Sequence, residues 1–370
     1  MRVAVVGGGL AGALLAWRLR QASTGVAVEV LTGGSPPGGD ATGASGGLVR
    51  GFELDAAACR VAAESLAELR GSQVLRRWAG YREIGSVFLP ARPAAPFGES
   101  VRTVEELLPG SVAVVGAGEL ALRYPFRELP DGTVGVVERY AGYLSPARLR
   151  SAVLAELGRC SVAVRALRVA GVTPAPAVRL ADGTTLRYDA VVVAAGAWTP
   201  RLLAASGPAA SGPAESGPAA GGPAGHGFRT KHIQYSLHAA GPPGLPAFVD
   251  ASDGLYGRPA DGGSLLIGLP SDRWDVDPDA VEPDHGLAAR ALASATRRLA
   301  GPITPHPQPR IVAAFDCYHP RPGLRLRPVG EAGVPLFTFT GGSGGAAKTV
   351  LAASRAAASD LLAPRVEVVR

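Results

Sequence analysis

The stretch RVAVVGGGLAGALLAWRLR (residues 2–20) decides the fold of this chain. An apolar run passes directly into Gly7-x-Gly9-x-x-Gly12 and then into an alanine- and leucine-rich helical segment, and a second apolar run follows at residues 26–31. Gly7 permits a tight strand-to-helix turn, Gly9 lets the backbone approach a pyrophosphate, and Gly12 allows the helix to pack closely on the strand. This strand–turn–helix–strand order predicts a dinucleotide site.

The groups that would hold the dinucleotide follow from this arrangement. The pyrophosphate is expected at the helix N-terminus, beside Leu10 and Ala11, because free N–H groups and the helix dipole favour anions there. The acidic residue that usually binds the adenosine ribose should end the second strand, but Thr32 stands at that position and Glu29 lies inside the strand. The Thr32 hydroxyl offers a neutral, weaker hydrogen bond. No arginine follows closely, so nothing here favours NADP.

Length and composition indicate a two-domain globular protein. The chain has 370 residues, of which 47% are hydrophobic and 18% charged. No apolar run reaches the roughly 18 residues that a membrane span needs, and the first strand leaves no room for a signal peptide. Cys59, Cys160 and Cys317 lack the paired spacing of a disulfide framework or a zinc site. We therefore expect a cytoplasmic protein, a monomer or small homo-oligomer, without a membrane span.

Charge excludes some partners and singles out two lysines. The net charge of +6 comes from scattered arginines without a nucleic-acid-binding motif, so no nucleic-acid partner is expected. Lys231 and Lys348 are the only lysines, which suggests that these positions need a compact ammonium group. No metal site is predicted, because none of four histidines has metal-ligand spacing: His232, His238, His306 and His319.

Other segments have recognisable local patterns. Residues 204–227 carry an SGPA repeat and read as a flexible linker. Residues 142–157 predict a helix with a serine cap followed by proline, and residues 162–169 alternate as a strand. Residues 248–268 predict a hairpin with its turn at Asp261-Gly262-Gly263. Residues 335–362 predict a strand, a glycine-rich turn and a long helix.

The order of these motifs resembles the FAD-dependent amine oxidoreductases of the D-amino-acid oxidase, glycine oxidase and monomeric sarcosine oxidase superfamily. The resemblance rests on five motifs: residues 7–12, GASGGLVRG (43–51), VVVAAGAWTP (191–200), LYGRPADGGSLLIG (255–268) and GGSGGAAK (341–348). It implies an α/β protein of two domains. One is a Rossmann-like FAD-binding domain with a parallel sheet and helices, and the other is a mostly antiparallel substrate domain.

The resemblance also assigns domain limits and cofactor contacts. The FAD-binding domain is expected from residues 1–84, 142–203 and 311–370, the substrate domain from residues 85–141 and 228–310, and the linker at residues 204–227. Beyond the N-terminal turn and Thr32, the expected FAD contacts are Ser45, Gly46, Val164, Gly196, Trp198, Gly342, Ser343, Gly344, Gly345 and Lys348. The last five lie on the loop that follows the flavin ring toward its N1–C2 edge, where a positive charge stabilises the reduced flavin.

Substrate contacts are implied for two pairs of residues. In the sarcosine-oxidase branch, an arginine and a lysine at the positions of Arg50 and Lys348 hold the substrate carboxylate above the flavin. Tyr256 and Arg258 lie on the hairpin expected to cover the flavin, and they are candidates for contact with the substrate.

Three positions depart from the sarcosine-oxidase pattern. Leu266 stands where these enzymes place the lysine that activates oxygen. Leu269-Pro270 replaces an expected histidine, which suggests a more apolar substrate side. Cys317 lies within about one residue of the cysteine that anchors flavin covalently, so a covalent link is an alternative to the noncovalent FAD that we expect.

The sequence therefore predicts an enzyme that oxidises the C–N bond of an amino acid or of a secondary or cyclic amine to an imine. A hydride passes to flavin N5, with the enzyme acting as an oxidase or in a biosynthetic tailoring step. A dehydrogenase with another acceptor and a non-catalytic flavin-binding module remain alternatives. A flavin monooxygenase is disfavoured, because its Gly-Asp-Gly signature is missing where VVAAGAWTP stands.

Overall fold

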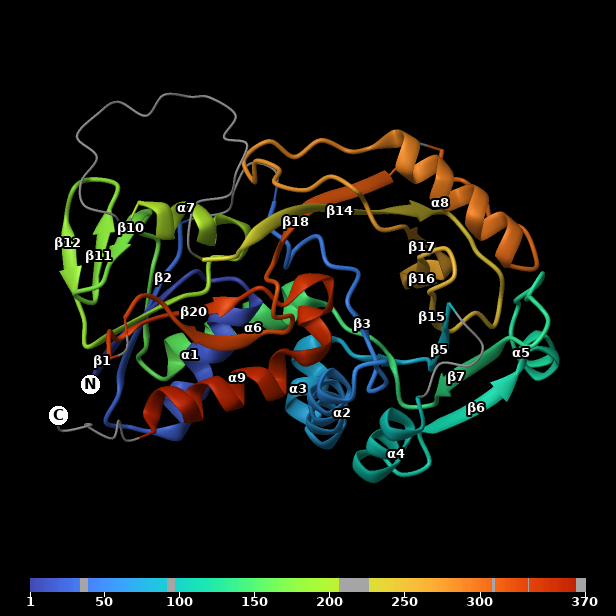
Figure 1. Ribbon diagram of the computed structural model, residues 1–370, viewed down its shortest axis with the longest axis horizontal. Coiled ribbons are helices and arrows are strands. Elements are labelled where there is room, and N and C mark those ends of the chain that lie inside the picture. Colours follow the sequence, from blue (N-terminus) through green and yellow to red (C-terminus); the bar gives the residue numbers. More distant parts are fainter. Residues whose placement is uncertain (34–38, 92–96, 206–225, 308–309, 332, 364–370) are drawn as a thin grey trace.

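The computed structural model describes residues 1–33, 39–91, 97–205, 226–307, 310–331 and 333–363. Most of the predicted linker therefore lies outside the described residues. The first strand of the chain belongs to a six-stranded sheet (Figure 1). All strand pairs of this sheet are parallel except the pair of β19 and β20. In spatial order its strands are β19 (Arg325–Pro328), β20 (Leu336–Thr340), β13 (Ala190–Val193), β1 (Arg2–Val6), β2 (Ala27–Leu31) and β9 (Ala163–Arg165).

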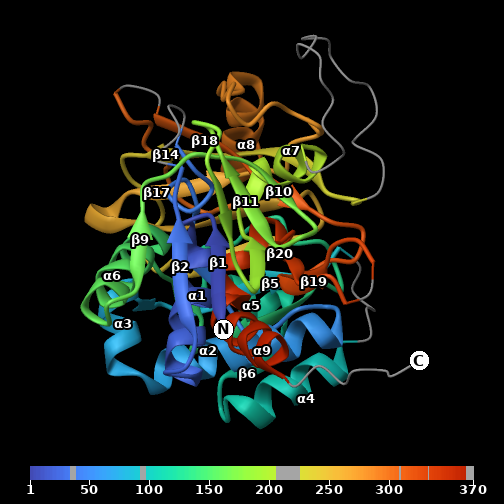
Figure 2. The ribbon, with the colours of Figure 1, turned by 90° about the vertical axis from the view of Figure 1, so that its left-hand side faces the viewer.

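Both faces of this sheet are covered. Val3, Val5 and Val192 point to one core, which the helices α1 and α9 close, while Val6 and Val191 point to a second core under a small antiparallel sheet. Figure 2 shows that small sheet in front of the parallel strands. The helices of this half are α1 (Leu10–Ala22), α2 (Ala56–Gly71), α3 (Gln73–Ala79), α6 (Pro146–Arg159), α7 (Thr199–Ala204) and α9 (Ala346–Leu362). The small sheet consists of β10 (Val169–Thr173), β11 (Ala177–Leu180) and β12 (Thr185–Arg187).

The second half is an eight-stranded sheet with one parallel pair, between β5 and β15. Helix α8 packs on β16 and β17 and lies along the outside of the sheet in Figure 1. The strands of the eight-stranded sheet are, in spatial order, β18 (Arg310–Tyr318), β14 (Arg229–His238), β17 (Leu265–Gly268), β16 (Leu255–Pro259), β15 (Ala247–Asp250), β5 (Ser86–Leu89), β7 (Val134–Glu138) and β6 (Val112–Gly116). The helices of this half are α4 (Gly98–Leu107), α5 (Ala117–Arg123) and α8 (His285–Arg298).

Short segments join the halves. A small sheet of β3 (Leu48–Val49), β8 (Gly142–Tyr143) and β4 (Arg82–Glu83) lies where the chain passes between them. The predicted domain limit at residue 311 falls inside β18, which pairs with β14 in the antiparallel sheet. Sheet membership therefore puts that crossing after Tyr318. The predicted α/β fold with a parallel and a mostly antiparallel sheet is confirmed.

Most local predictions hold, with one correction. Helix α6 begins at Pro146 after the Ser145 cap, as the sequence predicts. Strands β16 and β17 form the predicted hairpin, with its turn at Asp261–Gly263. The strand predicted at residues 162–169 is wrong as one element, because β9 pairs with β2 and the chain then turns into β10. None of the described helices is long and apolar enough to cross a membrane.

Candidate active site

The turn between β1 and α1 has the close contacts that its glycines predict. Gly7 adopts a φ of 117°, and a Cβ there would lie 2.4 Å from the carbonyl oxygen of Ala194 on the neighbouring segment. A Cβ on Gly12 would lie 2.0 Å from the carbonyl oxygen of Gly7. No side chain fits at either position, so the helix starts directly against the strands.

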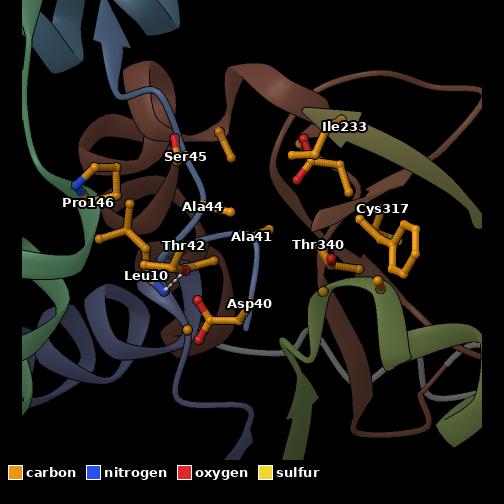
Figure 3. A pocket seen from close by; sticks show the side chains of 18 of the residues that line it. Leu10, Asp40, Ala41, Thr42, Ala44, Ser45, Pro146, Ile233, Cys317 and Thr340 are labelled. Atoms are coloured by element: carbon orange, nitrogen blue, oxygen red, sulfur yellow. Dashed lines mark hydrogen bonds between the residues drawn. The ribbon is translucent and has the colours of Figure 1, made fainter. Parts of the chain in front are cut away.

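A second loop closes over the start of α1. Leu10 N–H donates a hydrogen bond to Thr42 Oγ1 at 3.0 Å, which is the dashed line in Figure 3. Asp40 holds this loop, because one of its oxygens accepts from Gly43 N–H at 2.7 Å and the other pairs with Arg150 of α6. The loop therefore supplies polar groups beside the glycine turn.

A cavity of about 1250 Å³ runs from the glycine turn to the start of α9. In Figure 3, Leu10 and Ser45 lie on one side of it and Ile233 and Thr340 on the other. The structure brings most predicted site residues to its wall: Gly7, Gly9, Leu10, Ala11, Thr32, Ser45, Gly46, Arg50, Gly196, Trp198, Tyr256, Gly342, Ser343, Gly344, Gly345 and Lys348. Three predicted residues are not part of the lining: Gly12, Val164 and Arg258. Gly12 nevertheless shapes the turn.

Thr32 stands where the sequence places it, at the end of β2. Its N–H donates to the carbonyl oxygen of Arg165, and its methyl group packs against Gly8, where a Cβ would lie 2.5 Å away. Glu29 is not a substitute for the usual ribose-binding acid. Its carboxylate accepts from Arg165 at 2.9 Å and from the Tyr188 hydroxyl at 2.8 Å, away from the cavity lining.

The far wall beside β2 differs from the expectation. Val164 lies on β9 opposite Val30, and the cavity is lined there by Arg168 to Ala170 instead. The predicted backbone contact of Val164 with adenine stays a prediction. Gly196 lines the cavity with a φ of 53°, and the indole N–H of Trp198 donates to Asp279 at 2.8 Å.

Arg50 and Lys348 meet, although nearly 300 positions separate them in the sequence. Both contact one oxygen of Glu53: Arg50 Nη2 lies 3.0 Å from Oε1, and Lys348 Nζ forms an ion pair with the same atom. Burial would raise the pKa of Glu53, but Arg50 and Lys348 outweigh it and the pKa lies below its usual value. Burial lowers the pKa of Lys348, and Glu53 opposes that change.

A second carboxylate supports this cluster from behind. Glu138 is almost fully buried, and its two oxygens accept from the backbone N–H groups of Gly51 (2.8 Å) and Phe52 (3.0 Å). Burial raises its pKa, and the two backbone donors and Arg50 oppose the rise. Glu138 therefore fixes the backbone between Arg50 and Glu53.

The two hairpin residues have different positions. Tyr256 lines the cavity, and its hydroxyl donates to the carbonyl oxygen of Gln234 at 2.7 Å. Arg258 instead donates from Nε to the carbonyl oxygen of Gly46 at 2.7 Å, with its guanidinium 4.0 Å from the centre of the Tyr143 ring. The predicted substrate contact of Arg258 is not supported by this placement, because the side chain is used to hold the loop of Ser45 and Gly46 to β16.

Strand β18 presents an acid and a thiol. Cys317 lies at the cavity wall (Figure 3), but burial raises its pKa to about 12, so the reactive thiolate is disfavoured. Asp316 also lines the cavity, and burial raises its pKa to about 7. Lys231 lies directly opposite on β14, yet its ammonium group is placed 4.6 Å from the Trp274 ring centre instead of on Asp316.

Comparison with known proteins decides the family. Residues 2–359 match the model of the family DAO, described as FAD dependent oxidoreductase. The chain belongs to this family. No curated protein sequence is similar enough to count as a match.

Solved structures of other proteins with the fold of this FAD-dependent oxidoreductase align with nearly the whole chain. L-proline dehydrogenase from P. horikoshii is 16% identical with a TM-score of 0.74, covering 98% of this chain and 93% of that one. Iminodiacetate oxidase from Chelativorans sp. BNC1 is 20% identical with a TM-score of 0.72, covering 99% and 97%. Glycine oxidase from Geobacillus kaustophilus is 18% identical with a TM-score of 0.72, covering 97% and 94%. At these identities they establish the two-domain fold.

The residues of this FAD-dependent oxidoreductase fit the cofactor. The side-chain-free turn at Gly7 and Gly9 gives a pyrophosphate direct access to the start of α1. The cavity of about 1250 Å³ continues from there to the 3₁₀ turn at Ser343–Gly345, so it has room for a dinucleotide that carries a flavin ring. Within the described part of the chain, no group of His, Cys, Asp and Glu is arranged to hold a metal ion.

Several site residues of this FAD-dependent oxidoreductase were missed by sequence reasoning. Thr42 and Arg150 lie at the cofactor end of the cavity, and Glu53, Glu138 and Asp316 lie at or behind its other end. Apart from the Arg50–Glu53 pair, the hydrogen-bond and ion-pair partners of these residues are distant in sequence, so spacing carries no signal for the contacts. The partial exception is Asp316, whose neighbours Cys317 and Tyr318 were already recognised as part of a motif.

Proposed function

We propose that this chain oxidises the C–N bond of an amine or amino acid to an imine, with noncovalently bound FAD as the electron acceptor. One observation carries the proposal. A single cavity joins the dinucleotide turn of an FAD-dependent oxidoreductase to a pocket with a partly buried cation pair, Arg50 and Lys348, and a cavity-lining tyrosine, Tyr256. The structurally similar proteins named as a proline dehydrogenase, an iminodiacetate oxidase and a glycine oxidase support the substrate class.

When bound, FAD takes a hydride and thereby accepts two electrons from the carbon that carries nitrogen. The chain's own contribution is orientation and charge stabilisation. Lys348 lies at the start of α9, one turn after the glycine-rich segment, so its positive charge is held at the cavity wall. Leu269 and Pro270 supply an apolar surface for the substrate. The imine product needs only water to hydrolyse to a carbonyl compound and an amine.

Two features support noncovalent binding. Cys317 is 4% exposed and belongs to the same core cluster as Phe228 and Leu336. Its raised pKa disfavours the thiolate that attack on a flavin methyl position requires. Acid precipitation of the yellow protein should therefore leave flavin in the supernatant, and colour in the pellet would contradict this assignment.

The experiment that tests the function is anaerobic reduction of the bound flavin. Purified protein is mixed with a panel of amino acids and secondary or cyclic amines, and the loss of absorbance near the flavin maximum is followed. Bleaching by at least one class of amine, with formation of the matching carbonyl product, supports the proposal. Yellow protein that no amine bleaches would instead favour a non-catalytic flavin-binding role.

An acceptor other than oxygen is the second candidate, and one observation favours it. Leu266 is buried where sarcosine oxidases place their oxygen-activating lysine, so this position supplies no ammonium group that could activate oxygen. We expect slow reoxidation of the reduced protein by air and faster reoxidation by an artificial acceptor dye. Stopped-flow mixing of reduced protein with each acceptor measures both rates.

A further inference from the structure

The pair Arg50 and Lys348 is already bound to a carboxylate of the chain itself. Arg50 Nη2 and Lys348 Nζ converge on Oε1 of Glu53, and the Nε of Arg50 donates to the carbonyl oxygen of Phe52 at 2.9 Å. The Arg50 and Glu53 side chains are only 12% and 19% exposed, so their ion pair is partly shielded from water. Glu53 thus makes the contacts that a bound carboxylate would make with these two cations.

The charges of the cluster cancel. Arg50 and Lys348 contribute two positive charges, and Glu53 and Glu138 contribute two negative charges when both are ionised. Glu138 uses both oxygens as acceptors for backbone N–H groups, which is the hydrogen-bonding pattern of an ionised carboxylate. A further carboxylate would add an uncompensated negative charge to a partly buried site, which is costly.

Glu53 is also held firmly in place. The preceding residue, Phe52, is fully buried, with its ring centre 5.4 Å from that of Phe88 and 6.1 Å from that of Phe97. Asp55 follows as the N-cap of α2 and accepts from Ala58 N–H at 2.8 Å. Moving Glu53 away from the cations would disturb a packed segment between two anchors.

We propose that Glu53 permanently occupies the Arg50–Lys348 pair and that the substrate is an amine without a free carboxylate. This inference rests on the proposed function, because it narrows the class of amine that this cavity accepts. It also predicts that removing the charge of Glu53 converts the site into one that binds carboxylates.

The first test compares matched substrates with the FAD-loaded wild-type protein. Pyrrolidine is paired with proline, dimethylamine with sarcosine, and benzylamine with phenylglycine, and each is mixed anaerobically with the protein. We expect the amine of the productive pair to reduce the flavin at least tenfold more efficiently, in kcat/KM, than its carboxylated partner. The reverse preference overturns the inference. Failure of every compound to reduce the flavin would instead contradict the proposed function.

The second test uses binding and needs no turnover. Equilibrium dialysis of benzoate is compared among wild type, Glu53→Gln and a control, Glu64→Gln. Glu64 lies on α2, and its ion pair with Arg355 at the surface is long, at 3.5 Å. Its replacement should therefore leave benzoate binding at the wild-type level. Glu53→Gln should bind benzoate at least tenfold more tightly, since the two cations lose their resident anion. Equal or weaker binding overturns the inference.

The Glu53→Gln variant could fail to fold, because it leaves two partly buried cations without a carboxylate. Bound FAD per chain and far-UV circular dichroism decide whether it has folded. If it has not, Glu53→Asp serves instead: the shorter side chain withdraws from Lys348, and benzoate binding should tighten at least threefold. The matched-substrate comparison requires no variant and decides the inference in either case.

Discussion

At the scale of single residues, two kinds of position determine this site. Gly12 matters because of what it lacks, since its missing side chain lets α1 start against Gly7. Asp316 matters because it places a carboxylate at the cavity wall. This carboxylate has no hydrogen bond or ion pair to the described residues around it. Each has a measurable consequence.

Gly12→Ala should reduce bound FAD severely. The new Cβ would overlap the carbonyl oxygen of Gly7, and relief requires the helix to move from the strand at a cost of about 1–3 kcal/mol. Flavin absorbance per chain and the thermal midpoint measure both effects. Gly158→Ala is the matched control, because this glycine lies in α6 with nothing within 4 Å of the added Cβ. It should stabilise the protein by about 0.5–1 kcal/mol. Equal FAD content in the two variants would contradict the prediction.

Asp316→Asn should stabilise the protein at alkaline pH and hardly at all in acid. Its folded-state pKa of about 7 is raised by burial, so the unfolded chain releases this proton first as the pH rises. Wild-type stability is therefore lost between about pH 4 and pH 7, with an upper limit of about 4 kcal/mol at roughly 1.4 kcal/mol per pKa unit. Thermal unfolding at pH 5 and pH 8 measures the difference.

A carboxylate with the opposite shift provides the control for that experiment. Asp182 lies in an exposed turn, and hydrogen bonds from Thr184 lower its pKa. Asp182→Asn should lose a little stability at neutral pH and none in strong acid. A gain for Asp316→Asn that does not change between pH 5 and pH 8 would show that its carboxyl group does not titrate abnormally.

At the scale of elements, the site depends on ties between the two sheets. Arg258 connects β16 to the loop of Ser45 and Gly46, and Arg201 connects α7 to Asp277 and Asp279 in the segment before α8. Such ties position cavity walls that belong to different sheets. Arg258 is therefore a positioning residue.

Arg258→Met should weaken FAD binding about tenfold or more. The substitution keeps much of the apolar stem but removes the donor to Gly46, and a hydrogen bond from a charged group contributes about 1.5–3 kcal/mol. Titrating the apoprotein with FAD and following flavin fluorescence gives the dissociation constant. Arg123→Met is the control, because that side chain forms an exposed pair with Glu119 within α5. If Arg258→Met lowers the thermal midpoint but binds FAD like wild type, the tie serves stability alone.

Prediction from sequence succeeded where the determinants are local. The turn at Gly7, the Ser145–Pro146 helix start and the Asp261–Gly263 hairpin each depend on residues within a few positions of one another. It failed for Glu53, because that residue's partner Lys348 arrives from the other end of the chain. It also gave no indication of the bond from Arg258 to Gly46, because alternation along a strand shows which face a side chain is on but not which acceptor it reaches.

At the scale of the whole molecule, the SGPA segment is the most replaceable part. Residues 206–225 lie outside the described residues, and their sequence contains no large apolar side chain that could anchor them. Deleting residues 208–223 should leave bound FAD and the thermal midpoint nearly unchanged. Flavin absorbance per chain and differential scanning calorimetry measure the two. A loss of more than half of the FAD would mean that the segment packs on the fold.

The strand order of the parallel sheet has a consequence for biosynthesis. Strand β20 pairs with β13 near the middle of the sheet, and α9 packs against α1 and α2. The site that begins at the Gly7–Gly12 turn therefore also needs α9, the last helix described. Translation delivers the glycine turn more than 300 residues before Gly342–Gly345 and Lys348, which line the other end of the same cavity. While the residues in between are synthesised, the nascent chain therefore holds the pyrophosphate end of this cavity without the wall at the start of α9.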